Sequence, residues 1–349
     1  MPDSHENVRM LDAARLERML IGLYVAAGVS PEDARIGANA LVDADLRGVH
    51  THGARLIPNY LKGIRSGSLN PKATLKTIRD DGTTVLFDAE HGIGHVAGAK
   101  AMRLAVERAL ELGTCTIGVR ATGHTGAMAY YTQMAADAGC IGYANTNGGI
   151  VMIPPGGREK AVGLNPLSWA VPTDRPWSIN LDMATSVVAG GKLVVAQEQG
   201  KPIPLGWALD PQGNPTTDPK LGMEGGMLPL GGPKGYGLAV ILDVLCGVLT
   251  GGRFGKGLGN TGSGLMLQAI SIERFQPLDE FRERMRALID QLKAGALAPG
   301  SDGIYLPGEI EYNLKQKRLR EGIPYHEVNL VDLRREAEAA GVPYDIEIS

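Results

Sequence analysis

Two histidines lie two positions apart in the stretch DLRGVHTHGARL, residues 45–56, and imidazole is the side chain best suited to proton transfer or metal binding near neutral pH. His50 and His52 would face the same side of an extended segment, like the HxH pairs of metal-dependent hydrolases. A catalytic zinc site needs a third protein ligand, which the spacing does not select, and no HExxH motif occurs. Three interpretations stay open: the ligands of a metal-dependent hydrolase, a proton shuttle assisted by Thr51, or a polar turn.

Three further polar residues occur where a ligand site could form. Arg55 offers a forked donor that suits a carboxylate. His124, in ATGHTGAMAYY, follows a β-like run at the entrance of a helical pattern, where it either faces the crevice of an α/β sheet or is a solvent-exposed loop histidine. Asp182, in NLDMATS, either caps the helix expected after it or contacts the ribose or amide of a ligand.

The segment HGIGHVAG matches the dinucleotide fingerprint G-x-G-x-x-A at Gly92, Gly94 and Ala97. Four residues separate the preceding β-like run from the first glycine, where the fingerprint requires a tight turn. The next β-like run ends in Arg120 instead of an acid that could bind a ribose. We therefore interpret the match as accidental in a chain with 48 glycines.

A second glycine cluster, GGPKGYG at 231–237, stands directly before a helical pattern and contains Lys234. Glycines, a cation and a helix start together suit a phosphate group, although an ordinary glycine-rich turn has the same composition. It is not a Walker A loop, because Gly235 follows the lysine. A serine nucleophile is not indicated either, since no G-x-S-x-G motif occurs.

The bulk composition excludes several classes of partner. With 349 residues, a net charge of -3 and no long basic run, the chain lacks the clustered cations that bind nucleic acid or an anionic membrane surface. Three widely spaced cysteines without a CxxC pair encode neither a disulfide framework nor a thiolate zinc site, which fits a reducing cytoplasm. The most apolar stretch, 237–252, is interrupted by Asp243 and is too short to span a bilayer.

Hydrophobic periodicity predicts helices at the start of the chain, then alternating strands and helices, and a charged helical end. The alternation alone favours a parallel, doubly wound α/β sheet. The expected helices are 11–27, 31–46, 95–112, 127–138, 184–198, a buried helix 235–249 and helical segments from 278 onward; the expected strands are 83–87, 114–119, 141–146, 161–171, 177–182 and 265–272, with 201–233 irregular.

Taken together, the motifs resemble those of the type 2 malate/L-lactate dehydrogenases, in the family's order and over nearly the whole chain. The strings that carry the resemblance are DLRGVHTHGARL, FDAEHGIGHVAG, GHTGAMAYY, GGREKAVGLNPLSWAVP, DMATSVVAGGK, GWALDPQGNPTTDP, GGPKGYGLA and LPGEIE. The resemblance implies an α/β, non-Rossmann dinucleotide-binding fold with a large mixed sheet flanked by helices. It also implies a homodimer, a helical domain of residues 1–75 with 305–349, and a cofactor-binding α/β domain of residues 76–304.

The resemblance further implies a hydride transfer between NAD or NADP and the 2-carbon of a small 2-hydroxy or 2-oxo acid. Malate, lactate, ureidoglycolate and sulfolactate types, and cyclic imine carboxylates, all stay open as substrates. His52 or His124 would exchange the proton, no metal is required, and Arg55, three residues after His52, is the expected substrate arginine. The expected cofactor contacts are Asp182, Met183, Ala184, Lys234, Gly235, Pro307, Gly308 and Glu309.

The sequence leaves the choice between NAD and NADP open. Arg158 and Lys160 could neutralise the 2'-phosphate of NADP, or they are solvated charges of a loop.

Overall fold

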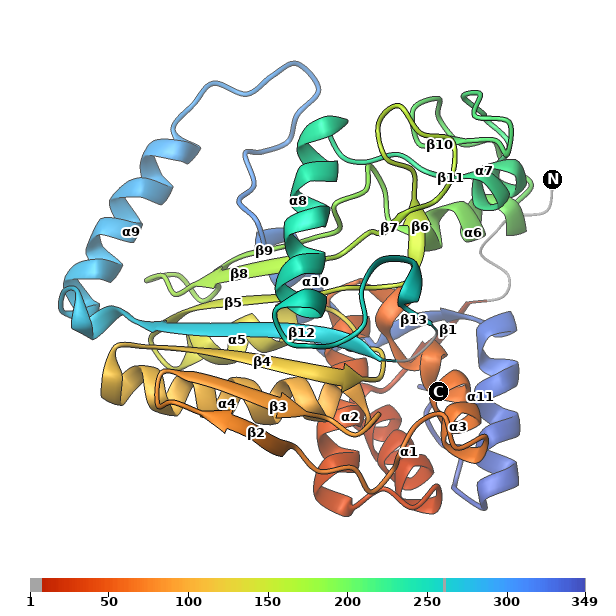
Figure 1. The fold of residues 1–349 in the computed structure, drawn as a ribbon, viewed down its shortest axis with the longest axis horizontal. Helices are drawn as coiled ribbons and strands as arrows, with labels where there is room; N and C mark the ends of the chain where they lie inside the picture. The colour runs from red at the N-terminus through yellow and green to blue at the C-terminus, as the bar shows by residue number, and fades with distance from the viewer. Residues whose placement is uncertain (1–7, 260–261, 349) are drawn as a thin grey trace.

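A seven-stranded sheet forms the centre of the molecule in the computed structural model, which describes residues 8–259 and 262–348 (Figure 1). Within it β3 and β4 are parallel, while the other neighbouring strands are antiparallel. The strand order is β2 (Lys76–Asp80), β3 (Thr84–Asp88), β4 (Thr114–Thr122), β12 (Ser263–Ser271), β5 (Cys140–Thr146), β8 (Leu167–Val171) and β9 (Ile179–Met183).

The mixed sheet confirms the fold implied by the family resemblance, and the parallel doubly wound sheet favoured by the alternation alone is wrong. The difference arises at β12, which comes late in the chain and inserts between β4 and β5, antiparallel to both. A local pattern indicates that such a segment is a strand, but it carries no information about which strands it will join.

Helices cover both faces of the sheet. The helices α4 (Gly94–Leu112) and α5 (Ala129–Asp137) pack against β4, β5 and β12, and α8 (Pro233–Asp243) with the π-helical turn η3 (Val244–Val248) approaches the same strands (Figure 1). Successive side chains of a strand point to opposite faces. Accordingly, Ile117 belongs to the main hydrophobic core, whereas a Cβ at the neighbouring Gly118 would lie 3.1 Å from Thr250, just beyond η3.

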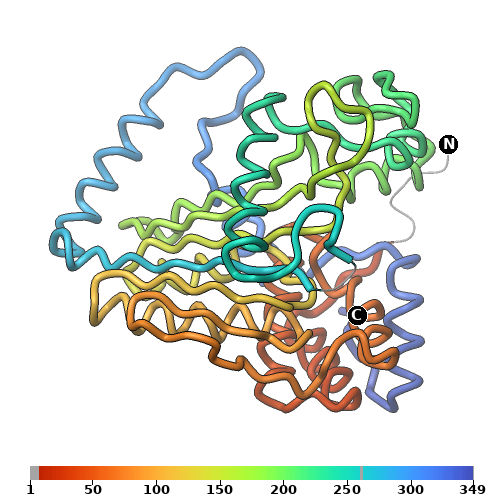
Figure 2. The backbone as a smooth tube through the Cα atoms, in the orientation of Figure 1, coloured from red at the N-terminus to blue at the C-terminus, as the bar shows by residue number. Residues whose placement is uncertain are grey.

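The first described segment of the chain pairs with a segment near its other end (Figure 2). Strand β1 (Val8–Leu11) pairs with β13 (Ile323–His326), and α1 (Ala13–Ala26) contacts α11 (Glu327–Ala340). Helices α2 (Pro31–Leu46), α3 (Ile57–Arg65) and α10 (Glu309–Glu321) complete this helical part. One cluster of buried side chains extends from these helices into α4 and the sheet, and the division at residues 75/76 and 304/305 stays a prediction.

Helix α2 begins and ends as the sequence predicts, and its end leads into the histidine pair. The Ser30 hydroxyl accepts a hydrogen bond from Asp33 N at 3.2 Å, and Pro31 occupies the first turn. After Leu46 the chain forms two short 3₁₀ turns, η1 (His50–His52) and η2 (Ala54–Leu56).

A smaller part of the fold is built from the region after β5. A four-stranded sheet joins β10 (Ala208–Leu209), β11 (Gly226–Met227), β6 (Ile150–Met152) and β7 (Val162–Gly163). The expected helix 184–198 starts only at α6 (Gly190–Glu198), and the stretch expected to be irregular contains α7 (Pro219–Gly225). The remaining elements are η4 (Gly255–Gly257), η5 (Ile272–Arg274) and α9 (Leu278–Lys293).

The helix expected to be buried at 235–249 is partly exposed instead. Its sequence is apolar on all sides, which is typical of a helix with both faces covered. The sheet covers one side, while the other carries exposed Val240, Ile241, Val244, Val248 and Leu249. No helix among the described residues is long and apolar enough to cross a membrane.

Candidate active site

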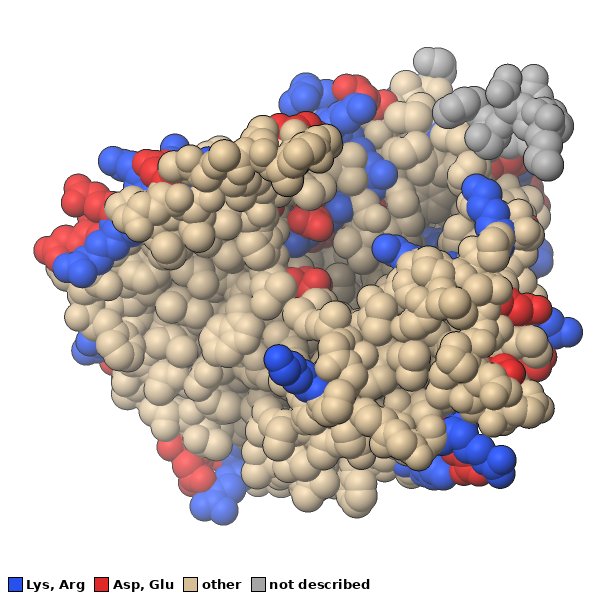
Figure 3. All heavy atoms as spheres, turned by 90° about the horizontal axis from the view of Figure 1, so that it is seen from above, with Lys and Arg blue, Asp and Glu red and all other residues tan. Residues whose placement is uncertain are grey.

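A cavity of about 720 Å³ opens where the end of α2, the start of α5, β9, the start of α6 and the segment before α10 meet. Figure 3 shows that the surface is hollowed on one face, with basic and acidic side chains on the walls of the hollow. The predicted site residues that line the cavity are His52, Asp182, Met183, Ala184, Pro307 and Gly308. The fold thus brings together residues that are far apart in the sequence.

His52 lies on the cavity wall in η1, and the neighbouring Thr51 orients it. Thr51 Oγ1 and His52 Nδ1 share a hydrogen bond of 3.0 Å, which leaves Nε2 free for a ligand. Burial lowers the pKa of His52 from its usual 6.5, because water no longer solvates the imidazolium form. Gly191 permits the close approach of α6, since a Cβ there would lie 2.5 Å from Thr51 Cγ2.

His124 stacks on His52, with ring centroids 5.5 Å apart and an interplanar angle of 21°. Tyr60 Oη and His124 Nδ1 share a hydrogen bond of 2.7 Å. The residue is exposed on one side, but its ring lies among His52, Tyr60 and His95, and this loss of solvation, followed by the nearby His52, lowers the pKa of His124 to about 4. His124 is not among the residues that line the cavity, so the stacked pair brings His52 to the wall, with His124 packed against it.

His95, in the first turn of α4, is a third imidazole of this group and is fully enclosed. Its ring lies edge-on to Tyr60 and His124, with centroid distances of 5.5 Å and 6.3 Å. Neither ring nitrogen has a hydrogen-bond partner among the described residues. Burial, followed by His124 and His52, lowers the pKa of His95 to about 3, so this ring stays neutral at physiological pH.

His50 belongs to a different group, centred on the buried Asp45. Asp45 Oδ1 is 2.8 Å from His50 Nδ1, while Asp45 Oδ2 accepts hydrogen bonds from Ala54 N at 2.8 Å and from Tyr325 Oη at 2.5 Å. The residues that the structure describes contain no group of three or more His, Cys, Asp or Glu side chains placed to hold a metal ion. The geometry therefore gives the metal-dependent hydrolase no support.

Asp182 is the second-last residue of β9 and lines the cavity, where it also caps a helix. Its Oδ2 accepts a hydrogen bond of 2.8 Å from Ala129 N, the first residue of α5. The capped helix is thus α5, packed across the sheet, and not the helix that follows in sequence. The carboxylate is reachable through the cavity yet surrounded by protein, and this burial raises the pKa of Asp182 to about 6.

The residues of the Pro307-Gly308-Glu309 turn have two roles: two of them line the cavity, and the third stabilises the turn. Pro307 and Gly308 line the cavity, and Gly308 has φ +88 with a Cβ position only 2.9 Å from Asn180. Glu309 points elsewhere, pairing with Lys293 at 2.5 Å and accepting a 3.2 Å hydrogen bond from Leu306 N. Its carboxylate therefore fixes the turn.

Three other predicted site residues lie outside this cavity. Lys234 is exposed in the first turn of α8, and Gly235 is buried against the backbone of Leu230. Arg55, in η2, is half-buried and is not among the lining residues. Their assignments to cofactor and substrate stay predictions.

Several cavity residues were not found from the sequence. Arg47, at the end of α2, lines the wall, as do Gly190, Gly191, Tyr305 and Glu311. A signal existed for the glycines, since two of them before a helical pattern leave backbone amides accessible. Nothing in the local pattern distinguishes Arg47 from a solvated charge.

The glycines of HGIGHVAG have a packing role, in agreement with the rejected fingerprint. A Cβ at Gly94 would lie 2.4 Å from the carbonyl oxygens of Gly123 and His124, so α4 begins in backbone contact with the loop that carries His124. A Cβ at Gly92 would lie 2.6 Å from Ala73 Cβ. These glycines therefore help to position the histidine.

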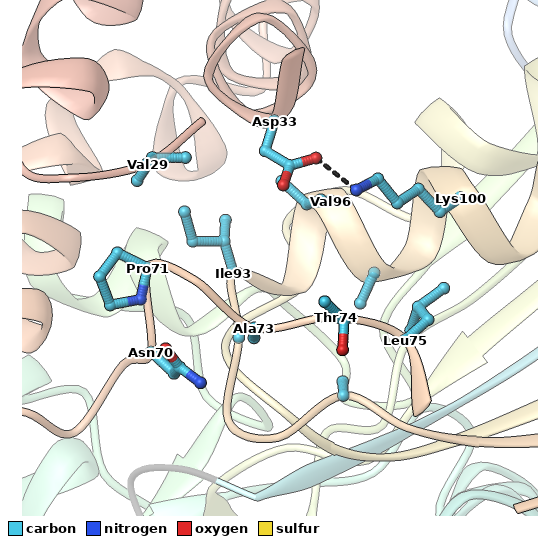
Figure 4. Close-up of a pocket in the computed structure, with 13 residues that line it drawn as sticks. Val29, Asp33, Asn70, Pro71, Ala73, Thr74, Leu75, Ile93, Val96 and Lys100 are labelled. Atoms are coloured by element: carbon cyan, nitrogen blue, oxygen red, sulfur yellow. Dashed lines mark ion pairs between the residues drawn. The ribbon is translucent and has the colours of Figure 1, made fainter. Parts of the chain in front are cut away.

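A separate hollow beside the Asp33–Lys100 ion pair is too small for a substrate (Figure 4). Its volume of about 20 Å³ is comparable to the space that one water occupies. The large cavity, in contrast, combines a size suitable for a ligand, titratable groups with shifted pKa values and glycine walls. This combination is that of an enzyme active site.

The residues present fit a nicotinamide dinucleotide. The cavity has the volume typical of a small-molecule site. The start of α6, Ala189 to Gly191, lines the wall without a side-chain cap, so its amides are available to an anionic group. The Asp182 carboxylate lines the cavity and can accept from a ribose hydroxyl or an amide.

Comparison with known proteins identifies the family. The malate/L-lactate dehydrogenase family model matches residues 11–334, and the chain belongs to this family. Malate dehydrogenase from Pyrococcus horikoshii is 39% identical over 351 residues, covering 97% of each chain. The structure of sulfolactate dehydrogenase from Methanocaldococcus jannaschii superposes with a TM-score of 0.90 at 34% identity, covering 95% of this chain and 98% of the other.

The relatives differ in coenzyme. One is ureidoglycolate dehydrogenase (NAD+) from Escherichia coli, 34% identical, with 88% of this chain and 90% of the relative covered. Another is (2R)-3-sulfolactate dehydrogenase (NADP+) from Chromohalobacter salexigens, 32% identical, with 89% and 93% covered. The comparisons therefore support the family and an NAD(P)-dependent dehydrogenase activity, and they give no support to a hydrolase.

Proposed function

We propose that the protein oxidises a small 2-hydroxy acid, or reduces the corresponding 2-oxo acid or cyclic imine carboxylate, with a nicotinamide coenzyme in the large cavity. The coenzyme, when bound, accepts or supplies the hydride at the 2-carbon. The observation that carries the proposal is the stacked His52–His124 pair, with 5.5 Å between ring centroids, in which His52 lines the cavity. Hydride transfer from an alcohol must be accompanied by loss of the hydroxyl proton, which an imidazole can take.

The histidine pair is suited to carry a single proton. The nearby His52 is one of the causes that lower the pKa of His124. The two rings are therefore not both protonated at neutral pH. His52 has its Nε2 free, because Nδ1 is hydrogen-bonded to Thr51, and Tyr60 bonds His124 at Nδ1. Each histidine is thus oriented through one nitrogen and available through the other.

Substrate orientation is assigned to an arginine. Arg55 stays the candidate, as its family position suggests, although it lies outside the lining of the large cavity. A 2-hydroxy acid presents a carboxylate beside the reacting carbon, and an arginine binds this group through two parallel hydrogen bonds. The substrate could be malate, lactate, ureidoglycolate or sulfolactate, or a cyclic imine carboxylate.

The test is a spectrophotometric panel at 340 nm with these acids, their oxo forms and both coenzymes. We expect coenzyme-dependent turnover of at least one carboxylated pair. A nicotinamide coenzyme that binds while none of the substrates is turned over would contradict the proposed reaction. Zinc bound tightly in stoichiometric amount, with no coenzyme binding, would instead favour the hydrolase.

We also assign a homodimer to this protein. The exposed apolar side chains of α8 and η3, with Phe254, form one face that its own chain leaves uncovered. Exposed apolar patches of this kind mark interaction surfaces, and a second copy is the simplest occupant. Ile241→Arg should shift the protein to monomers in analytical ultracentrifugation, whereas the control Leu110→Arg on α4 should not. A monomeric wild-type protein would contradict the assignment.

The cytoplasmic location stays a prediction. The three cysteines are free and buried, which is compatible with a reducing compartment.

A further inference from the structure

A second cavity, of about 420 Å³, adjoins the large one. Arg47, Asn180 and Gly308 line both cavities. The turn that contains Pro307 and Gly308 therefore lies at the boundary between them. Asn180 is fully engaged, with its amide oxygen and nitrogen bonded to Ser168 and Gln133. Arg47 is therefore the side chain at this junction that is free to contact a ligand.

The smaller cavity is lined by four cations and one carboxylate. The cations are Arg47, Arg175, Arg282 and Lys315. The single acid, Asp137, already accepts a 2.8 Å hydrogen bond from Gln133 Nε2. Trp177 and Tyr312 provide aromatic surface on which a planar base can stack.

The ion pairs of these cations differ in strength. Lys315 pairs with Asp43 at 2.5 Å, and Arg175 pairs with Asp290 at 2.5 Å and Asp174 at 3.7 Å. The acid that holds the Arg175 terminal nitrogen, Asp290, is 60% exposed, so this pair is weak and can be exchanged for a stronger anion. Arg282 pairs at 3.4 Å with an acid that is almost fully exposed.

Arg47 has neither a hydrogen bond nor an ion pair with any residue of the described ranges 8–259 and 262–348, apart from its backbone. The positive charge of Arg47 acts to lower the pKa of Asp182, so the guanidinium lies near the carboxylate of the large cavity. An unpaired arginine between two cavities suits the diphosphate that joins the halves of a dinucleotide.

We propose that the bound coenzyme crosses between the cavities at Arg47, with its diphosphate on that residue, and that the smaller cavity binds the adenosine end with a 2'-phosphate on Arg175. The protein is therefore specific for NADP over NAD. The inference rests on the proposed function, since it assumes that the large cavity holds the nicotinamide end.

Two other cations that could have served a 2'-phosphate are placed elsewhere. Lys160 Nζ donates a 2.6 Å hydrogen bond to Met223 O. Neither Lys160 nor Arg158 is among the residues that line either cavity. The sequence alternative in which they are ordinary loop charges is therefore favoured.

The experiment is a binding titration of each coenzyme without substrate. Binding is measured by coenzyme fluorescence and by calorimetry. We expect wild-type protein to bind NADPH at least about tenfold more tightly than NADH, the effect of one charge-assisted contact. Adenosine 2',5'-bisphosphate should displace NADPH more effectively than AMP, because the two compounds differ only in the 2'-phosphate.

Two variants separate the roles. Arg175→Gln should remove most of the preference for NADPH and leave NADH binding unchanged. Arg47→Gln should weaken both coenzymes by a similar factor, because both contain the diphosphate. Arg284→Gln, an exposed α9 arginine outside the cavity, removes the same charge and should change neither. Unchanged thermal melting identifies variants that have folded.

The outcomes distinguish this inference from the function. Equal binding of NADPH and NADH by the wild type, or an Arg175→Gln variant that keeps the full preference, would overturn the assignment of the 2'-phosphate while leaving the dehydrogenase intact. Tighter binding of NADH would do the same. No binding of either coenzyme by the wild type would sink the proposed function itself.

Discussion

His50 and His52 are separated by one residue, yet they belong to two polar groups with opposite hydrogen-bonding states. Around Asp45, each carboxylate oxygen has a partner, and the group joins η1, η2 and β13. Around His52, in contrast, imidazole nitrogens are left without protein partners, and His95 has none at all among the described residues. A completed network holds the fold, while an incomplete one beside a cavity is available to a ligand.

The turn between the two histidines causes this division. An extended segment would place His50 and His52 on one side, but a 3₁₀ turn places residues i and i+2 on different sides. Gly53 then permits the chain to pass Asp45, since a Cβ there would lie 2.0 Å from Asp45 Oδ1. This geometry gives no support to the interpretation of the two histidines as a metal-binding pair.

The largest effect is expected from removing the cavity imidazoles. His52→Asn and His124→Asn, made separately, should each slow hydride transfer, and the residue that carries the proton should lose roughly a hundred- to ten-thousand-fold in rate. Stopped-flow single turnovers provide the measurement. His91→Asn is the matched control, because His91 lies outside the group at a positive φ that asparagine tolerates. Full rates in both variants would show that neither histidine transfers the proton.

A substitution in the Asp45 group should lower the stability of the fold and leave the rate of hydride transfer per folded molecule unchanged. Asp45→Asn replaces a buried charged acceptor of three hydrogen bonds, and we expect a loss of about 3 kcal/mol in the free energy of unfolding. Denaturant titration measures this loss. The surface variant Asp279→Asn should lose little by comparison, as its carboxylate is almost fully exposed. Equal stability of the two variants would contradict the division between the groups.

A smaller effect is expected at His50, whose side chain is one-third exposed. His50→Ala removes its hydrogen bond to Asp45 and should lower the free energy of unfolding by about 1 kcal/mol. Hydride transfer per folded molecule should stay at the wild-type rate. A rate loss as large as that of His52→Asn, at unchanged stability, would mean that His50 belongs to the active site.

The sequence predicts many helix and strand boundaries and the family, because these features depend on short stretches of residues. The Ser30 cap and the glycine at 28 define α1 and α2, and the order of motifs led to the family and to His52 and His124. The insertion of β12, the exposure of α8 and the position of Arg47 depend on contacts between distant segments. The ion pair between Glu309 and Lys293 depends on such a contact as well, and the assignment of Glu309 to the coenzyme stays a prediction.

The most direct test of the central claim is the pH dependence of single-turnover oxidation of the hydroxy acid. Burial lowers the pKa values of both cavity histidines, to about 4 for His124. The neutral base is therefore present above the lowered pKa and lost as pH falls through it. We predict a rate that holds constant down to below pH 6.5 and then falls in acid. A rate that stays flat through this acid range, or an acid limb well above 6.5, would contradict proton transfer by this pair.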